Sequence, residues 1–127
     1  MLLNLSNHPL NTWSNKQVET AEKQYGKIID IPFPKINPNA DENEINDLNE
    51  KFLSKIINLL KKSSDTKNAV HIMGELNFTF GIVTKLLHSG ITCIASTTNR
   101  DTINTENGKI VNFNFVRFRE YKTPLIR

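Results

Sequence analysis

Short apolar runs alternate with amphipathic segments along most of the sequence, and this alternation constrains the fold more than any other feature. The apolar runs occupy residues 2–6, 27–31, 69–73 and 91–95. Helical periodicity covers residues 15–25, 42–62 and 78–87. Strands that alternate with helices pair in parallel through right-handed crossovers. The sequence therefore predicts an α/β, Rossmann-like fold with a mainly parallel four-stranded sheet and helices on both faces.

Two of the helices carry start signals. Ser14 and Gln17 have the spacing of a capping box, and Gly26 supplies a stop for the helix between them. Asp41 and Glu44 repeat the capping-box spacing before the longest periodic segment. Its apolar residues recur at spacings of three and four: Ile45, Leu48, Phe52, Ile56, Leu59 and Leu60. This segment is the strongest helix prediction in the sequence.

The C-terminal part of the sequence departs from this alternation. Asn107-Gly108 is a strong hairpin signal, and residues 109–120 are rich in Val and Phe. We expect an antiparallel β-ribbon there, at the edge of the sheet.

Two arginines lie on this ribbon. Simple alternation places Arg117 and Arg119 on the face of Phe113 and Phe115, but the apolar pattern shifts at Val116. A β-bulge or burial of both faces would explain the shift. The two arginines could bind a phosphate, contact an adjacent subunit, or remain solvated.

Composition and motif searches narrow the class of protein. With 127 residues, a formal charge of +3 and 38% hydrophobic residues, the chain is expected to form one domain over residues 1–127. It lacks a basic leader and an apolar run long enough to span a membrane, so we expect a cytoplasmic protein without a membrane partner. There is no phosphate-binding Walker loop, dinucleotide fingerprint or Cys/His cluster. We expect no cofactor and no metal.

Polar clusters follow three of the predicted strands. They are Ser6-Asn7-His8, Gly74-Glu75 and Ser96-Thr97-Thr98-Asn99-Arg100. In open α/β sheets, ligands bind outside the carboxyl ends of the strands. Hydroxyl groups form hydrogen bonds with phosphate or ribose oxygens, and the guanidinium of Arg100 can donate two hydrogen bonds to one phosphate. These clusters therefore predict a polar ligand site, provided that the three strands are neighbours.

Structural roles compete with this interpretation. Ser, Thr and Asn are common in turns and helix caps. Gly74 also suits the backbone turn that leads into the next helix. Glu75 fits a first-turn stabiliser, a general base or an acceptor for a ribose hydroxyl. His8 fits an acid, a base or an ordinary turn residue. His71 lies in an apolar strand and His88 near a helix end, so neither is a good catalytic candidate.

Five segments together resemble one known family. They are Leu3-Asn4-Leu5-Ser6-Asn7-His8-Pro9-Leu10, Ile31-Pro32-Phe33-Pro34, Val70-His71-Ile72-Met73-Gly74-Glu75, Ala95-Ser96-Thr97-Thr98-Asn99-Arg100 and Phe115-Val116-Arg117-Phe118-Arg119-Glu120-Tyr121. They look like small CRISPR-associated proteins of the stand-alone ring-nuclease or CARF-like type. The similarity spans nearly the whole chain.

The resemblance implies a homodimer that binds a cyclic oligoadenylate across its two-fold axis. In ring nucleases, a ribose 2′-hydroxyl attacks the adjacent phosphorus, without a metal. By analogy, phosphates would be held by Ser96, Thr97, Thr98 and Arg100. Asn7 and His8 would orient ribose or protonate the leaving oxygen, and Glu75 would contact adenine or a hydroxyl. On this analogy His8 and Arg100 are the catalytic candidates.

The sequence also fits other functions. The same clusters suit a small metabolic or regulatory domain that binds another nucleotide or a phosphosugar. Alternatively, residues 109–121 contact a protein partner and the strand ends are ordinary loops.

Overall fold

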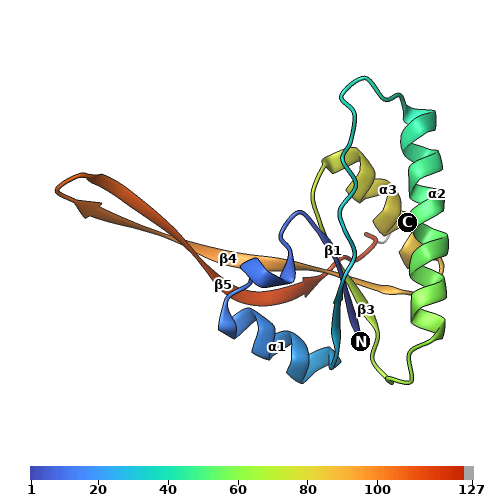
Figure 1. Ribbon diagram of the computed structural model, residues 1–127, viewed down its shortest axis with the longest axis horizontal. Coiled ribbons are helices and arrows are strands. Elements are labelled where there is room, and N and C mark those ends of the chain that lie inside the picture. The colour runs from blue at the N-terminus through green and yellow to red at the C-terminus, as the bar shows by residue number, and fades with distance from the viewer. Residues whose placement is uncertain (125–127) are drawn as a thin grey trace.

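The computed structural model, which describes residues 1–124, contains one five-stranded sheet and three α-helices (Figure 1). The strands are β1 (Leu2–Ser6), β2 (Ile28–Asp30), β3 (Ala69–Met73), β4 (Thr92–Thr105) and β5 (Gly108–Glu120). The α-helices are α1 (Asn15–Tyr25), α2 (Glu42–Lys61) and α3 (Leu76–His88), and a 3-10 helix (Leu10–Thr12) precedes α1. The strand order is β2-β1-β3-β4-β5, with every pair parallel except β4 and β5. The predicted α/β class, mainly parallel with an antiparallel C-terminal pair, is confirmed.

Local cap chemistry sets the helix ends. The Ser14 side chain accepts a hydrogen bond from the Gln17 backbone N–H, and α1 ends at Gly26, whose φ of 85° suits glycine. The α2 helix begins in the same way, with the Asp41 side chain accepting from the Glu44 N–H. The first two helices therefore lie where the sequence predicts them.

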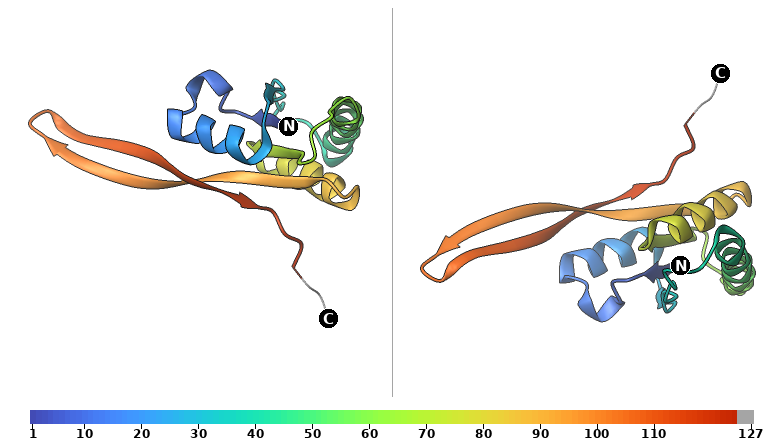
Figure 2. Two further views of the ribbon diagram at one scale, coloured as in Figure 1. Left: turned by 90° about the horizontal axis from the view of Figure 1, so that it is seen from below. Right: turned by 90° about the horizontal axis from the view of Figure 1, so that it is seen from above.

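The helices cover both faces of the sheet. Side chains alternate along a strand, so Leu3 and Leu5 of β1 pack with α2 and α3, whereas Leu2 packs with α1. The core on the α2 and α3 face includes Val70, Ile72, Phe78, Ile82 and Leu86. The core on the α1 face includes Trp13, Ala21, Ala69, Ile94, Phe115 and Phe118. Figure 2 shows that the β4–β5 hairpin extends well beyond both groups of helices.

The fourth strand corrects a prediction. The sequence predicts that this strand ends at residue 95, before the polar residues Ser96 to Arg100, but β4 continues to Thr105. Antiparallel pairing with β5 along this whole length satisfies the backbone of a stretch too polar to predict a strand by itself.

The fifth strand contains the irregularity that its apolar pattern suggested. Thr97 pairs with Arg117 and Thr98 pairs with Phe115, which leaves Val116 as an extra residue in β5. This β-bulge places Phe115 and Phe118 on the same face, against α1. The shift of face is therefore explained by a bulge.

Among residues 1–124, no helix has the length and apolar character needed to cross a membrane.

Candidate functional site

A buried chain of hydrogen bonds links three neighbouring strands beneath α1. His71 on β3 is only 1% exposed. Its Nδ1 atom lies 2.9 Å from Asn4 Oδ1 on β1, and its Nε2 atom lies 2.7 Å from Ser96 Oγ on β4. Gln17 Nε2 of α1 donates to the same Ser96 oxygen at 2.9 Å. The chain thus runs from β1 across the sheet to the first turn of α1.

The partners of Asn4 define the tautomer of His71. Asn4 Nδ2 donates to the His8 carbonyl and to Asp30 Oδ1, both at 2.9 Å, and these two groups can only accept. The Oδ1 atom of Asn4 therefore faces His71, whose Nδ1 carries the hydrogen. The Nε2 atom of His71 is then the acceptor for the hydroxyl of Ser96.

This arrangement has the geometry of a serine next to a base, but the imidazole is poorly suited to accept a proton. Burial, with a smaller contribution from His8, lowers the pKa of His71 from 6.5 to about 4. At about 1.4 kcal/mol per pKa unit, the folded protein disfavours the charged ring by about 3 kcal/mol. We therefore assign His71 as a neutral link that positions Ser96 and Gln17.

The loop after β1 is held by the same network. Three donors converge on the backbone carbonyl of His8: Asn4 Nδ2 at 2.9 Å, Ser6 Oγ at 3.1 Å and Trp13 Nε1 at 2.9 Å. Ser6 is buried, whereas the side chains of Asn7 and His8 are exposed. Of the first predicted cluster, Ser6 therefore belongs to the interior, and Asn7 and His8 remain available to a ligand.

The second predicted cluster has structural partners. A methyl group at Gly74 would overlap the ring of Phe33, so glycine is needed there for close packing. The carboxylate of Glu75 accepts from the backbone N–H groups of Asn77, at 2.6 Å, and Phe78, at 3.3 Å. Glu75 is thus the N-cap of α3, which explains why this helix begins two residues before the predicted start at residue 78.

The third predicted cluster lies on β4, and its members differ in role. Thr97 Oγ1 accepts from the Arg117 backbone N–H at 3.2 Å. Thr98 and Asn99 are exposed, and the Arg100 guanidinium lies 6.0 Å from the centre of the Phe113 ring. Ser96 alone joins the buried chain.

The bulge decides the position of the two β5 arginines, which simple alternation would place on the face of Phe113 and Phe115. Phe118 points into the core on the α1 face, so its neighbours Arg117 and Arg119 point to the opposite face. The bulge at Val116 causes this change, because it separates them from the face of Phe115. They are exposed and do not share the α1 side with Ser96 or Thr98.

A cleft of about 380 Å³ opens between α1 and the base of the hairpin. Its walls combine hydroxyls, an amine, amides and aromatic rings. The lining residues are Thr12, Ser14, Lys16, Gln17, Thr98, Phe113, Asn114 and Phe115. Gln17 belongs both to this cleft and to the buried chain, so the chain fixes one wall of the cleft.

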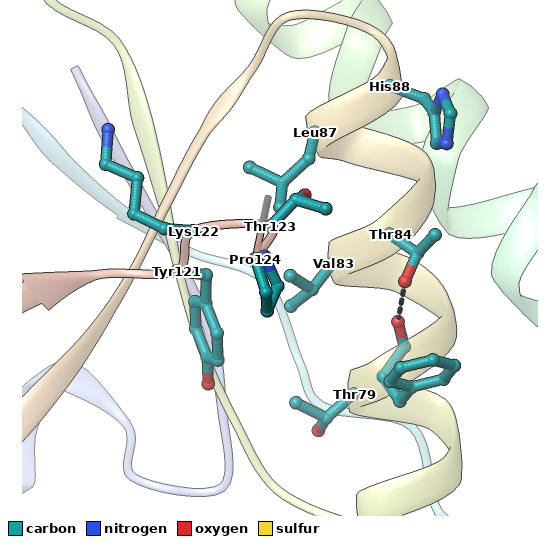
Figure 3. A pocket seen from close by; sticks show the side chains of 10 residues that line it. Thr79, Val83, Thr84, Leu87, His88, Tyr121, Lys122, Thr123 and Pro124 are labelled. Carbon is teal, nitrogen blue, oxygen red and sulfur yellow. Dashed lines mark hydrogen bonds between the residues drawn. The ribbon is translucent and has the colours of Figure 1, made fainter. Parts of the chain in front are cut away.

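A second cavity, of about 490 Å³, lies between α3 and the segment after β5 (Figure 3). Its walls are largely apolar, including Phe80, Val83 and Leu87, and none of the predicted site residues lines it. One of its hydroxyls, that of Thr84, donates to the Phe80 carbonyl within the helix. We place the candidate site in the smaller cleft because the polar groups suited to a phosphate converge there.

Comparison with known proteins places the chain in a family. The model of the uncharacterized protein MJ1673 family matches residues 1–119. The chain belongs to this family. Among curated proteins, none matches the sequence.

For this member of the MJ1673 family, the residues at the centre of the site are not among those that the sequence predicts. Asn4 and His71 look like interruptions of apolar strands, and Gln17 looks like part of a capping box. The sequence does offer one signal, which is alternation: Asn4, His71 and Ser96 each follow an apolar residue by two positions (Leu2, Ala69 and Ile94), and residues two apart in a strand share a face, here the face covered by α1. Within residues 1–124, no group of three or more His, Cys, Asp or Glu side chains is placed to hold a metal ion.

Proposed function

We propose that the chain binds a phosphate-bearing nucleotide, and specifically a cyclic oligoadenylate, in the cleft between α1 and the base of the β4–β5 hairpin. The observation that carries this proposal is the composition of the cleft. Lys16 and the first turn of α1 supply positive charge and backbone donors, and Thr98 supplies a hydroxyl. Phe113, 66% exposed, offers a ring on which a base can stack.

The size of the cleft suits one nucleotide unit. A volume of about 380 Å³ falls near the lower end of the range for small-ligand sites. A cyclic oligoadenylate is larger, so each cleft would hold one unit of the ring and a second subunit would hold another. A homodimer is therefore part of the proposal.

The strand order supports a Rossmann-like assignment. The order β2-β1-β3-β4 changes direction between β1 and β3, as it does in doubly wound nucleotide-binding folds. The loop after β1 leads directly to α1, which forms one wall of the cleft. This placement fits a ligand bound beyond the carboxyl ends of the parallel strands.

The test is calorimetric titration with cyclic oligoadenylates of several ring sizes, with AMP and a linear oligoadenylate for comparison. A charge-assisted bond to phosphate contributes about 1.5–3 kcal/mol, so Lys16→Ala is expected to weaken binding at least about 10-fold. Lys23→Ala is the matched control, because Lys23 is exposed at the other end of α1. Absence of heat with every ring, or equal effects of the two variants, contradicts the proposal.

Ring opening is a further step that the exposed imidazole of His8 favours. The ribose 2′-hydroxyl would release its proton to solvent as its oxygen bonds to phosphorus, the bond from phosphorus to the 5′-oxygen would break, and the 5′-oxygen would take up a proton. His8 would supply that proton, and Arg100 would stabilise the charge on the phosphate oxygens. Chromatography that detects products with 2′,3′-cyclic phosphate ends tests this step. The His8→Ala variant is expected to lose these products while it still binds the nucleotide.

A further inference from the structure

The outer part of the β4–β5 hairpin, which we call the ribbon and define as residues 98–114, projects away from the rest of the molecule (Figures 1 and 2). Every residue from 98 to 114 is exposed. The buried residues of β5 begin only at Phe115. An isolated two-stranded hairpin is marginally stable in water, so a ribbon of this length benefits from a surface to pack against.

Both faces of the ribbon carry apolar side chains. Ile103 and Ile110 pair across the strands and are 51% and 50% exposed. Val111 and Phe113 lie on the other face, and Phe113 is 66% exposed. Exposed apolar residues that gather on one element mark an interaction surface.

The outer edge of β5 is also free. Within residues 1–124 the sheet order ends at β5, so no described strand pairs with the backbone groups of β5 that point away from β4. Such an edge is a template for another extended strand. A partner can therefore bind both through apolar contacts and through backbone hydrogen bonds.

The charge of the ribbon decides which partner fits. It carries two basic residues, Arg100 and Lys109, and two acidic residues, Asp101 and Glu106, so its net charge is zero. A neutral ribbon has no electrostatic preference for nucleic acid and does not repel a copy of itself. We propose that two copies of this chain associate through their ribbons. The proposal names the surface for the homodimer and does not require a nucleotide.

A charge-swap experiment tests this surface in the absence of any ligand. Asp101→Lys/Glu106→Lys makes the ribbon wholly basic, and Arg100→Glu/Lys109→Glu makes it wholly acidic. Analytical ultracentrifugation is expected to show a dimer for the unmodified chain, weaker dimers for each variant alone, and a one-to-one heterodimer in the mixture. Failure of the mixture to associate overturns the proposal.

Apolar substitutions provide an independent measurement. Ile103→Thr/Ile110→Thr retains β-branched residues and is expected to weaken dimerisation by at least about 30-fold, the equivalent of about 2 kcal/mol. The matched control is Leu76→Thr/Phe80→Thr, because these residues are 83% and 76% exposed on α3. Over the same range of protein concentration, the unfolding temperature should rise in the unmodified chain and the control, and rise much less in the ribbon variant.

The results separate this proposal from the proposed function. A monomer at every concentration, or equal loss in the α3 control, overturns ribbon pairing whatever the nucleotide titrations show. Dimerisation without nucleotide binding would retain the ribbon surface and contradict the proposed ligand.

Discussion

The Nε2 atom of His71 lies 2.7 Å from the hydroxyl oxygen of Ser96, a residue 25 positions later in the sequence. Because His71 is also hydrogen-bonded to Asn4, both ring nitrogens have partners in a nearly water-free environment. The contact connects the stability of the sheet to the wall of the cleft between α1 and the base of the hairpin, since Ser96 also accepts a hydrogen bond from Gln17, which lines that cleft.

Removal of the Ser96 hydroxyl should therefore lower stability. Ser96→Ala leaves a buried nitrogen of His71 without a donor, a change that costs about 1–3 kcal/mol in the free energy of unfolding. Urea unfolding followed by circular dichroism measures the loss. Thr98→Ala, two positions along the same face, is the control and should weaken nucleotide binding with little change in stability.

Stability should also fall in mild acid because of His71. Its pKa is about 4 in the folded chain and 6.5 when unfolded, so between these values the unfolded state binds more protons. The free energy of unfolding should drop as the pH falls from 6.5 towards 4, by about 3 kcal/mol in all. Unfolding at several pH values should show that His71→Gln lacks this component, whereas variants of the exposed His88 retain it.

Glu75 should act as a helix cap rather than as a ligand contact. Glu75→Ala removes the acceptor for two backbone N–H groups of α3 and should destabilise the chain by about 1 kcal/mol. Glu19→Ala, exposed in the middle of α1, controls for the loss of charge. Unchanged stability together with a 10-fold or greater loss of nucleotide affinity would show that the assignment as a cap is wrong.

Close packing of α2 against α3 should make Gly81 intolerant of alanine. Helix propensity favours alanine by about 1 kcal/mol, but a methyl group at Gly81 would overlap the buried side chain of Asn49. Overpacking costs about 1–3 kcal/mol, so Gly81→Ala should be destabilising. The same substitution in an Asn49→Ala background should be neutral or stabilising, which a double-mutant cycle of thermal unfolding measures.

The features that sequence predicted best are those decided by neighbouring residues. The first helix lies at residues 15–25 in the prediction and at Asn15–Tyr25 in the structure, because Ser14 and Gly26 act directly on its ends. The strands at residues 2–6 and 69–73 agree equally well, since turn residues bound each apolar run.

The features that sequence did not predict depend on distant residues. The outer half of β4 is extended because β5 pairs with it, and nothing within Ser96 to Arg100 reveals that partner. The contact between His71 and Ser96 depends on the order of the strands and on their register, in which Asn4 pairs with His71 and His71 pairs with Ile94. Strand order cannot be derived from local patterns. The sequence therefore did not indicate the chain of hydrogen bonds beneath α1, whose residues are of types common in any protein.

The single extra residue at Val116 has a consequence for how this chain can vary. Deletion of that residue would remove the bulge and leave a simple alternation in which Phe115 and Phe118 still share a face and Arg117 points to the other. Replacement by another β-branched residue would leave every face where it is. We therefore expect natural variants of this strand to accept either another residue or a one-residue deletion at position 116, because neither change moves Phe115 or Phe118 off the α1 face.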